Sequence, residues 1–499
     1  MIQDNSGRSI SRRGALRLAG AVAVAGAGAA ALGSASTAAA AEAFAHPGML
    51  HTQADLDRMA AKVKAGADRW KAGYAKLAAN SHAQSGWNPN PQATVYRGGG
   101  TPENYGTLYN DIHAAYQNAL RWHITGEAAY GNTARDILNA WSAKLTKLDG
   151  TADVFIAAGV YGYEFANAAE LMRGYTGFDL ARFQKMMLNV FYPKNHDFLV
   201  NHNGAFVTNY WGSWDLLTVA SVLAIGILCD DKAKVEEAVA YFKSGAGNGS
   251  IKNAINVIHP GGLGQVVEVG RDQGHALLSI GLMATICEMA WNQGIDLYGY
   301  DDNRFLKGAE YAAKWNLGQN VPYTPYTWKY GAPGVWAGQE TLTAASENSR
   351  GQARPIWEGI YNHYVNRRGL DAPFVTAIAA KARPEGGGGD YGSGGGFDHL
   401  GFGTLTFTRD EGDTTTATKA PSSSASGATS SDSSSGAAAS ASAAASASPS
   451  ASGGGVQAQG GSGDLAVTGA GSVAAIAGTG VLAIVGGLIA LRRRAGTRQ

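Results

Sequence analysis

The sequence predicts an all-α fold, an α/α toroid built from helical hairpins, between two unusual chain ends. Apolar residues recur at intervals of three and four through six segments between residues 111 and 317, the pattern of helices that bury one face. Short stretches of Gly, Pro and Asn separate these segments, as expected where helices turn back on one another. An α-solenoid is the alternative, but no fixed sequence period supports it.

Each expected element follows from its own pattern. Gly126 and Gly318 come directly after periodic segments and predict helix ends. The segment 214–229 is apolar almost all round and is therefore expected to be buried. Few segments before residue 403 alternate polar and apolar residues as strands do. Residues 403–408 have this alternation, and one late strand is expected there. The expected helices cover residues 111–126, 133–148, 165–173, 214–229, 273–291 and 303–317.

Composition excludes several classes of protein. Lys plus Arg number 40 and Asp plus Glu 39, a net charge of +1, which gives no reason to expect a nucleic-acid binder. Hydrophobic residues make up 45% of the chain, enough for a large core. The two cysteines, Cys229 and Cys287, exclude a disulfide-dense scaffold and a four-cysteine zinc site; they either pair or remain buried thiols. No metal or cofactor motif is present, so neither is predicted.

The N-terminus has the features of an export signal. Arg12 and Arg13 follow a polar start, and an Ala-, Gly- and Val-rich stretch without acidic residues runs to about residue 41. Small residues at 39–41 offer a cleavage site. The pattern predicts a signal peptide over residues 1–41 that the twin-arginine translocase reads. The alternative is a hydrophobic helix that stays as an anchor.

The C-terminus also has the features of a localisation signal. Residues 412–463 are mostly Ser, Ala, Gly and Thr, and such a segment is expected to form a disordered stalk. A Leu-Ala-Val-Thr-Gly pentapeptide at 465–469, an apolar run at 470–491 long enough to span a bilayer, and an Arg-rich tail follow. This order over residues 465–499 resembles a sortase cell-wall sorting signal. The resemblance implies cleavage between Thr468 and Gly469 and covalent attachment to peptidoglycan; a single-span membrane anchor is the alternative. The folded domain is then expected at 44–410.

Two segments within that domain combine residue types that suit sugar chemistry. Indole and phenol rings stack on sugar faces, while amides and guanidinium groups bind hydroxyls and carboxylates. The first segment is 201–215, in which any one Trp is equally well a core residue and Asp215 an acid that favours a helix start. Its candidates are His202, Asn209, Tyr210, Trp211 and Trp214.

The second segment, 259–275, ends in a dense polar cluster. If the helix begins at Arg271, then Arg271 and His275 share one face; if Asp272 is the N-cap, Arg271 lies outside the helix. The glycines do not form a phosphate loop, because no Gly-Lys-Ser/Thr follows them. Its candidates are Glu268, Arg271, Asp272, Gln273 and His275.

Two further loops are candidates for the edge of a cleft. Residues 321–328 form an aromatic loop that includes Tyr326, with a Pro-set turn that packs its rings as the alternative. Residues 98–105, with Asn110 and His113 beyond them, form either a mobile cleft-edge loop or a linker.

Several of these motifs together are similar to a known family. The stretch 209–326 resembles the alginate-lyase-domain family of polysaccharide lyases, and the resemblance extends more loosely over residues 46–409. It implies an α/α toroid that cleaves a uronic-acid polymer, alginate or glucuronan, by β-elimination without a cofactor. The matching motifs lie at 209–216, 224–226, 241–249, 264–275 and 288–294.

The resemblance also implies roles for single residues. Arg271 would bind the substrate carboxylate, and His275 would act as base or stabilise charge. Asn209 would neutralise the carboxylate, and Tyr210 is a candidate acid or base. A nearby cationic Arg or His would lower the pKa of such a tyrosine. Substrate contacts are expected from Trp211, Trp214, Glu268, Gln273 and Tyr326, the last also a lower-ranked acid or base.

One departure from the family pattern affects this assignment. Better-known alginate lyases carry Asn-Asn-His before the Tyr-Trp pair, whereas this chain has Val207, Thr208 and Asn209 there. Either His202 supplies the imidazole from a shifted loop, or another group such as a protonated Glu268 neutralises the carboxylate. Two other functions stay open: a glycoside hydrolase that uses Glu268 and Asp272 as its carboxylate pair, and a non-catalytic carbohydrate receptor on the cell surface.

Overall fold

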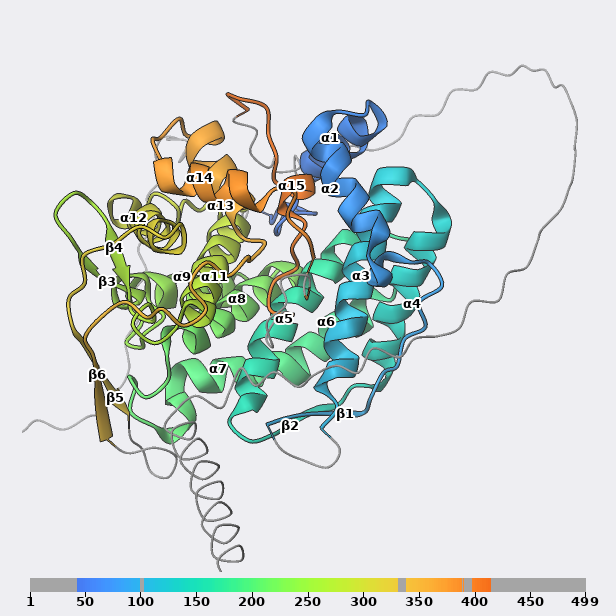
Figure 1. Ribbon diagram of the computed structural model, residues 1–499. Coiled ribbons are helices and arrows are strands. Elements are labelled where there is room, and N and C mark those ends of the chain that lie inside the picture. Colours follow the sequence, from blue (N-terminus) through green and yellow to red (C-terminus); the bar gives the residue numbers. More distant parts are fainter. Residues whose placement is uncertain (1–42, 99–102, 331–337, 388, 390–396, 414–499) are drawn as a thin grey trace, which may run out of the picture. The chain divides into compact units, whose positions relative to one another are not determined.

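The computed structural model describes residues 43–98, 103–330, 338–387, 389 and 397–413, which belong to one compact unit (Figure 1). Within these residues the fold is mostly helical, which confirms the all-α prediction. The expected signal peptide (1–41), the sorting signal (465–499) and the stalk beyond residue 413 lie outside the described residues.

The helices follow one another along the chain with short connections. They are α1 (Gln53–Lys64), α2 (Asp68–Ala79), α3 (Tyr105–Thr125), α4 (Ala128–Lys144), α5 (Asp153–Leu171), α6 (Leu180–Met186), α7 (Tyr192–Asn201), α8 (Gly212–Leu228), α9 (Lys232–Ser244), α10 (Ile251–Ala254), α11 (Gln273–Trp291), α12 (Tyr300–Asn316), α13 (Trp357–Tyr361), α14 (Pro373–Ala382) and α15 (Gly403–Thr406).

Three small sheets, each of two strands, lie among the helices of the described chain. The parallel pair is β1 (Thr94–Arg97) with β2 (Lys147–Gly150), in register from Thr94 opposite Lys147. The antiparallel pairs are β3 (Ile255–Ile258) with β4 (Gly264–Val266), and β5 (Tyr326–Tyr330) with β6 (Gly338–Leu342).

Most predicted helices are present, with shifted ends. The segment 273–291 matches α11, and Gly126 ends α3 in the left-handed conformation (φ 74°) that glycine adopts without strain. The segment 133–148 is too long, because α4 ends at Lys144 and β2 follows. The segment 165–173 is the end of α5; the whole helix is buried from Val154 to Leu171, and its earlier residues include Gly159 and Gly162, which lower helix propensity.

The expected strand at 403–408 is wrong, because this segment begins with helix α15. Alternating Thr and apolar residues suggested a strand. In the structure, the Thr406 hydroxyl donates to the Phe402 carbonyl and the Thr408 hydroxyl to the Thr404 carbonyl, each four residues back. These bonds satisfy the hydroxyls within a helical turn, so the alternation reflects buried threonines.

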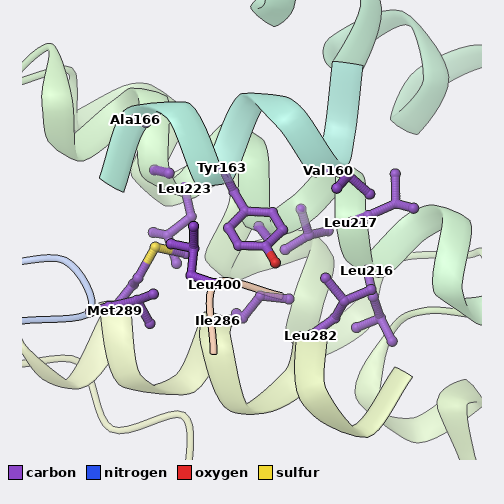
Figure 2. Packing of buried hydrophobic residues seen from close by; sticks show 14 of the residues in the cluster. Val160, Tyr163, Ala166, Leu216, Leu217, Leu223, Leu282, Ile286, Met289 and Leu400 are labelled. Atoms are coloured by element: carbon purple, nitrogen blue, oxygen red, sulfur yellow. The ribbon is translucent and has the colours of Figure 1, made fainter. Parts of the chain in front are cut away.

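The core lies between α5, α8 and α11 (Figure 2). Every residue of α8 is buried, as its apolar composition predicts. Tyr163 of α5 packs among leucines of α8 and α11, and its hydroxyl donates to the Asp398 carbonyl at 2.6 Å. In the described part of the chain, α11 alone has the length and apolar composition of a membrane span, but most of it is buried in this core. Cys229 and Cys287 are both free thiols.

A buried carboxyl group predicts how stability depends on pH. Glu385 accepts hydrogen bonds from the backbone N–H groups of Trp357 and Glu358 at the start of α13. Burial, and then the neighbouring Glu358 carboxylate, raise the pKa of Glu385 from 4.5 to about 8. The folded state therefore holds a proton that the unfolded chain releases above about pH 4.5, so the stabilisation is lost as pH rises toward 8.

We expect Glu385→Gln to reduce the fall in unfolding free energy between pH 5 and 8 by ~1–3 kcal/mol. Glutamine keeps the acceptor for the two N–H groups and does not ionise. Urea denaturation at each pH measures the effect, with the exposed Glu236→Gln as control. An unchanged pH slope in Glu385→Gln would contradict the prediction.

Candidate active site

Two helix N-termini form the base of the candidate site. Trp211 is the N-cap residue of α8, and Asp272 is the N-cap of α11, where its carboxylate accepts from the His275 N–H at 2.8 Å. Of the two arrangements open from the sequence, the structure has the one in which Arg271 precedes the helix. The positive ends of both helix dipoles therefore lie at this site.

Arg271 lies beside an indole ring at this base. Its guanidinium carbon is 5.2 Å from the Trp211 ring centre, and its Nε is 3.7 Å from the Asp272 carboxylate. Burial lowers the pKa of Arg271, while the charges of Glu268, Asp272 and Glu340 oppose this shift. An arginine remains charged even so, and the group is thus a cation on an aromatic face.

His275 is oriented by Asp272, the N-cap residue three positions earlier. The imidazole Nδ1 and the Asp272 carboxylate are 2.7 Å apart, and 12% of each side chain is exposed. Burial alone would raise the pKa of Asp272, but the bonds from His275 and the charge of Arg271 lower it to about 2. A charged Asp272 holds the proton on Nδ1 and makes Nε2 the nitrogen that accepts a proton.

Glu268 connects the N-termini of α8 and α11. It is fully buried, and its Oε1 accepts from the Ser213 N–H in the first turn of α8 at 2.7 Å. Burial raises the pKa of Glu268, against the lowering effects of Arg271 and His275. Its Oε2 has no hydrogen-bond partner within the described residues. Burial therefore disfavours the carboxylate form of Glu268, while Arg271 and His275 favour it.

The rings of Trp211, Trp328 and Tyr326 form an aromatic wall at Arg271. The Trp211 and Trp328 rings stack at 4.6 Å, and the Tyr326 ring lies 6.2 Å from Trp211. The Trp328 Nε1–H donates to the backbone carbonyl of Asn209, which fixes β5 against the start of α8. The Tyr326 hydroxyl donates to Asn248 Oδ1 at 3.2 Å. The 321–328 loop therefore contributes rings to the same site as Arg271.

His202 lies in a second, buried cluster beneath the first turn of α8. Its Nε2 is 3.0 Å from an Asp215 carboxylate oxygen and 2.9 Å from the Tyr241 hydroxyl, which donates to the same Asp215 oxygen. The other Asp215 oxygen accepts from the Gly249 N–H. A Cβ at Gly247 would lie 2.5 Å from Asp215, so the close approach requires glycine there. His202 is 4% exposed, and the cluster anchors the 201–204 turn to α8.

Asn209, Tyr210 and Trp214 lie in the buried layer between these two clusters. Asn209 and Tyr210 are fully buried, and the Trp214 ring is 4.6 Å from the Tyr210 ring. The Tyr210 hydroxyl accepts from the Asn203 amide at 2.8 Å.

The expectation that cationic neighbours lower a tyrosine pKa here is wrong. Burial raises the pKa of Tyr210, and burial together with the Glu268 charge raises the pKa of Tyr326 to about 12. Both phenols therefore carry their protons at neutral pH.

The Gln273 side chain forms its hydrogen bonds within the protein interior. Its amide N–H groups donate to the carbonyls of Val269 and Ser346, and its carbonyl accepts from Asn316. The side chain is fully buried. These bonds tie the segment around residue 346 to the start of α11.

Sequence reasoning did not single out three residues that complete this arrangement. Trp328 lies in the predicted aromatic loop but was not a candidate site residue. Tyr241 and Asn248 appeared only within the family-like motif at 241–249. Asn248 donates to the Tyr210 carbonyl and accepts from Tyr326, so it joins both clusters. The dense polar motif at 241–249 was the available signal.

A family model described as alginate lyase matches residues 58–321, which is more than half of the 499 residues. The chain belongs to the alginate lyase family. This membership supports polysaccharide lyase activity. The matched residues include α8, the start of α11 and every candidate except Tyr326.

Solved structures of this family are similar to the chain at low sequence identity. Alginate lyase A1-III from Sphingomonas species A1 is 14% identical with a TM-score of 0.49, over 74% of this chain and 98% of that chain. An alginate lyase from Bacteroides ovatus is 14% identical with a TM-score of 0.47, over 68% and 96%. An A1-III variant complexed with tetrasaccharide is 19% identical with a TM-score of 0.41, over 52% and 74%. Among curated proteins, none matches significantly.

Proposed function

We propose that this chain cleaves a uronic-acid polysaccharide, alginate or glucuronan, by β-elimination at the site formed by Arg271, His275 and the aromatic wall. The observation that carries the proposal is Arg271 on the Trp211 face, with its Nε and the His275 imidazole both near the Asp272 carboxylate. Trp211 and Trp328 are buried, so Trp211 positions the guanidinium, and the half-buried Tyr326 is the ring of the wall that a sugar bearing a carboxylate would contact.

The chemistry follows from these groups. Arg271 pairs with the substrate carboxylate and stabilises the enolate-like charge that develops when the C5 proton leaves. His275 takes this proton on Nε2 while Asp272 stabilises the resulting imidazolium. The electrons of the C5–H bond form the C4–C5 double bond, and the C4–O4 bond breaks. The departing O4 takes a proton from an acid, so that one chain becomes two without water.

The reaction products distinguish a lyase from a hydrolase. Elimination gives a new non-reducing end that is lighter by one water than the hydrolysis product, with an alkene proton in its NMR spectrum. A hydrolase on this fold would need two carboxylates across one bond. Glu268 is fully buried and Asp272 is bound to His275, so this pair favours the lyase. A saturated product end would contradict the proposal.

Tyr326 is the candidate for the acid. Its pKa of about 12 keeps the phenol protonated, and it stands on β5 beside Trp211. We expect Tyr326→Phe to lower kcat about 10²-fold with a smaller change in KM, since proton donation acts in the transition state. Steady-state kinetics on a uronate polymer measure this, with Tyr192→Phe, a half-buried tyrosine bound to Glu237, as control. An unchanged kcat would remove Tyr326 from this role.

We also propose that the helix pairs close into an α/α toroid. The short connections between α3 and α4, and between α8 and α9, support antiparallel hairpins. The toroid would present the loops at helix starts, including those before α8 and α11, along one cleft.

We further propose that the chain is exported by the twin-arginine translocase and attached to peptidoglycan by sortase, or held by a single membrane span. The Arg12-Arg13 pair and the Leu-Ala-Val-Thr-Gly pentapeptide support this. Substitution of both arginines by lysine should retain the protein inside the cell, as fractionation and immunoblotting would show. Release of the Thr468→Ala variant from the wall fraction distinguishes sortase attachment from a membrane span. Unchanged wall fractions for both variants would contradict the proposal.

A further inference from the structure

A second buried arginine lies on β1, among aromatic rings of α3 and α5. Arg97 is 4% exposed, and its Nη1 donates to the Tyr161 hydroxyl at 2.6 Å. Its guanidinium carbon is 4.7 Å from the Tyr105 ring centre and 5.5 Å from the Tyr161 ring centre. The guanidinium thus lies beside two phenol rings.

This guanidinium differs from the other buried arginines of the fold. Arg354, Arg367 and Arg409 each form an ion pair with a buried carboxylate, at 2.6, 3.0 and 2.7 Å. No ion pair joins Arg97 to a carboxylate among the residues that the structure describes. A buried cation without an anion is costly, because hydration is lost and no charge replaces it.

The buried Glu164, on whose pKa the charge of Arg97 acts, forms no ion pair with Arg97 among the described residues. Burial, together with the charge of Asp398, raises the pKa of Glu164 well above 4.5, and the charge of Arg97 only partly opposes this. Glu164 lies instead 3.5 Å from His113 in a fully buried pair. Cation–π contacts with Tyr105 and Tyr161 offset part of the desolvation of Arg97, but its remaining N–H groups are donors suited to an external anion.

Half-buried rings surround the approach to Arg97. Tyr109 and Phe397 stack at 4.3 Å, and the Tyr105 ring lies 5.8 Å from the Tyr109 ring. These three rings are partly exposed, and flat aromatic faces suit the faces of sugars. The surroundings of Arg97 therefore combine a cation with stacking surfaces, as at Arg271.

Packing connects this region to the candidate active site. A Cβ at Gly98 would lie 2.6 Å from the Asp153 side chain at the start of α5. The charge of Asp153 in turn raises the pKa of Tyr210. The start of α5 thus lies against β1, and the same helix packs along α8, where a Cβ at Gly159 would overlap the Leu217 side chain.

We propose that Arg97 binds the carboxylate of a second uronate unit, away from the bond that is cleaved, with Tyr105 and Tyr109 against the sugar ring. This subsite rests on the proposed function, because it assumes an acidic polysaccharide. It makes the enzyme selective for polymers that carry a carboxylate on successive units, and it acts on binding rather than on the chemical step. Arg97 is therefore a specificity-determining residue.

The test compares acidic and neutral ligands on the full chain, in a His275→Ala background that prevents turnover. Calorimetric titration uses tetramers of mannuronate, guluronate and glucuronate, and the same tetramers with their carboxylates reduced to alcohols. We expect Arg97→Gln to raise the Kd of a bound acidic tetramer about tenfold, the size of a lost charge-assisted bond. The Kd of the reduced tetramer should change less than twofold, and Arg97→Lys should recover at least part of the loss.

Arg135→Gln is the matched control, because Arg135 also lies over a tyrosine ring but is paired with Asp136. Thermal denaturation verifies that each variant is folded. An unchanged Kd in Arg97→Gln, or an equal loss for acidic and reduced tetramers, would overturn the inference. If acidic tetramers bind as expected but the parent chain yields no unsaturated product, the proposed function fails while the Arg97 site stands. If no acidic tetramer binds the parent chain, both fail.

Discussion

Arg271→Ala is expected to lower kcat/KM on a uronate polymer by about 10²–10³-fold, the usual effect of removing one preorganised group that stabilises developing negative charge. The guanidinium lies at the N-termini of α8 and α11, against Trp211. Arg271→Lys keeps the charge but loses the planar fork, so most of the loss should remain. Initial rates over a range of polymer concentrations measure both variants.

The control for this prediction is another arginine on an indole. Arg350 lies 3.5 Å from the Trp315 ring centre and pairs with Glu347, so Arg350→Ala removes a similar contact elsewhere. Its kcat/KM should stay within about twofold of the parent value. If Arg271→Ala remains folded and retains activity at the level of Arg350→Ala, then Arg271 does not bind the substrate carboxylate.

Asp272→Asn is expected to separate the two roles of Asp272. Asparagine is as good an N-cap as aspartate, so the start of α11 and the unfolding free energy should change by less than about 1 kcal/mol. The neutral amide, however, neither fixes the His275 tautomer nor stabilises its imidazolium, and kcat should fall about 10²-fold or more. His275→Ala should cause at least the same loss. Kinetics and urea denaturation on the same preparations measure both quantities.

Asp231→Asn provides the matched control, since Asp231 is the N-cap of α9 and accepts from the Lys234 N–H. It should alter stability by a similar amount and leave kcat unchanged. Loss of stability without loss of kcat in Asp272→Asn would mean that Asp272 is only a cap, and that His275 is not the base.

Helix α11 shows why much of the fold could be predicted from the sequence. Its apolar stripe, the Asp272 cap and the turn after Trp291 all mark the same boundaries. The first half of α5 was not predicted, because Gly159 and Gly162 lower its helix propensity, although their close packing against α8 leaves no room for a larger residue. Buried threonines in and after α15 gave the alternating pattern of a strand, since nothing local shows that their hydroxyls bond to backbone carbonyls.

The candidate site could be predicted where its residues are adjacent in sequence. The spacing from Glu268 to His275 placed the cap, the cation and the imidazole together. The position of His202 beneath α8, bound to Asp215 and Tyr241, depends on a tertiary contact across 13 and 39 residues and has no local signature. Arg97 was missed for the same reason. What distinguishes it is a buried guanidinium without an ion pair among the described residues, and only the packed structure shows this.

The central claim is that this chain eliminates rather than hydrolyses or merely binds a uronic-acid polymer. The most direct measurement incubates the full chain with polymannuronate, polyguluronate, glucuronan and hyaluronan, and follows absorbance near the ultraviolet edge, where the new C4–C5 double bond absorbs. A steady rise on at least one polymer, abolished by Arg271→Ala and by His275→Ala, is the predicted result. No rise on any polymer, together with measurable binding of one of them, would contradict the account and indicate a carbohydrate receptor.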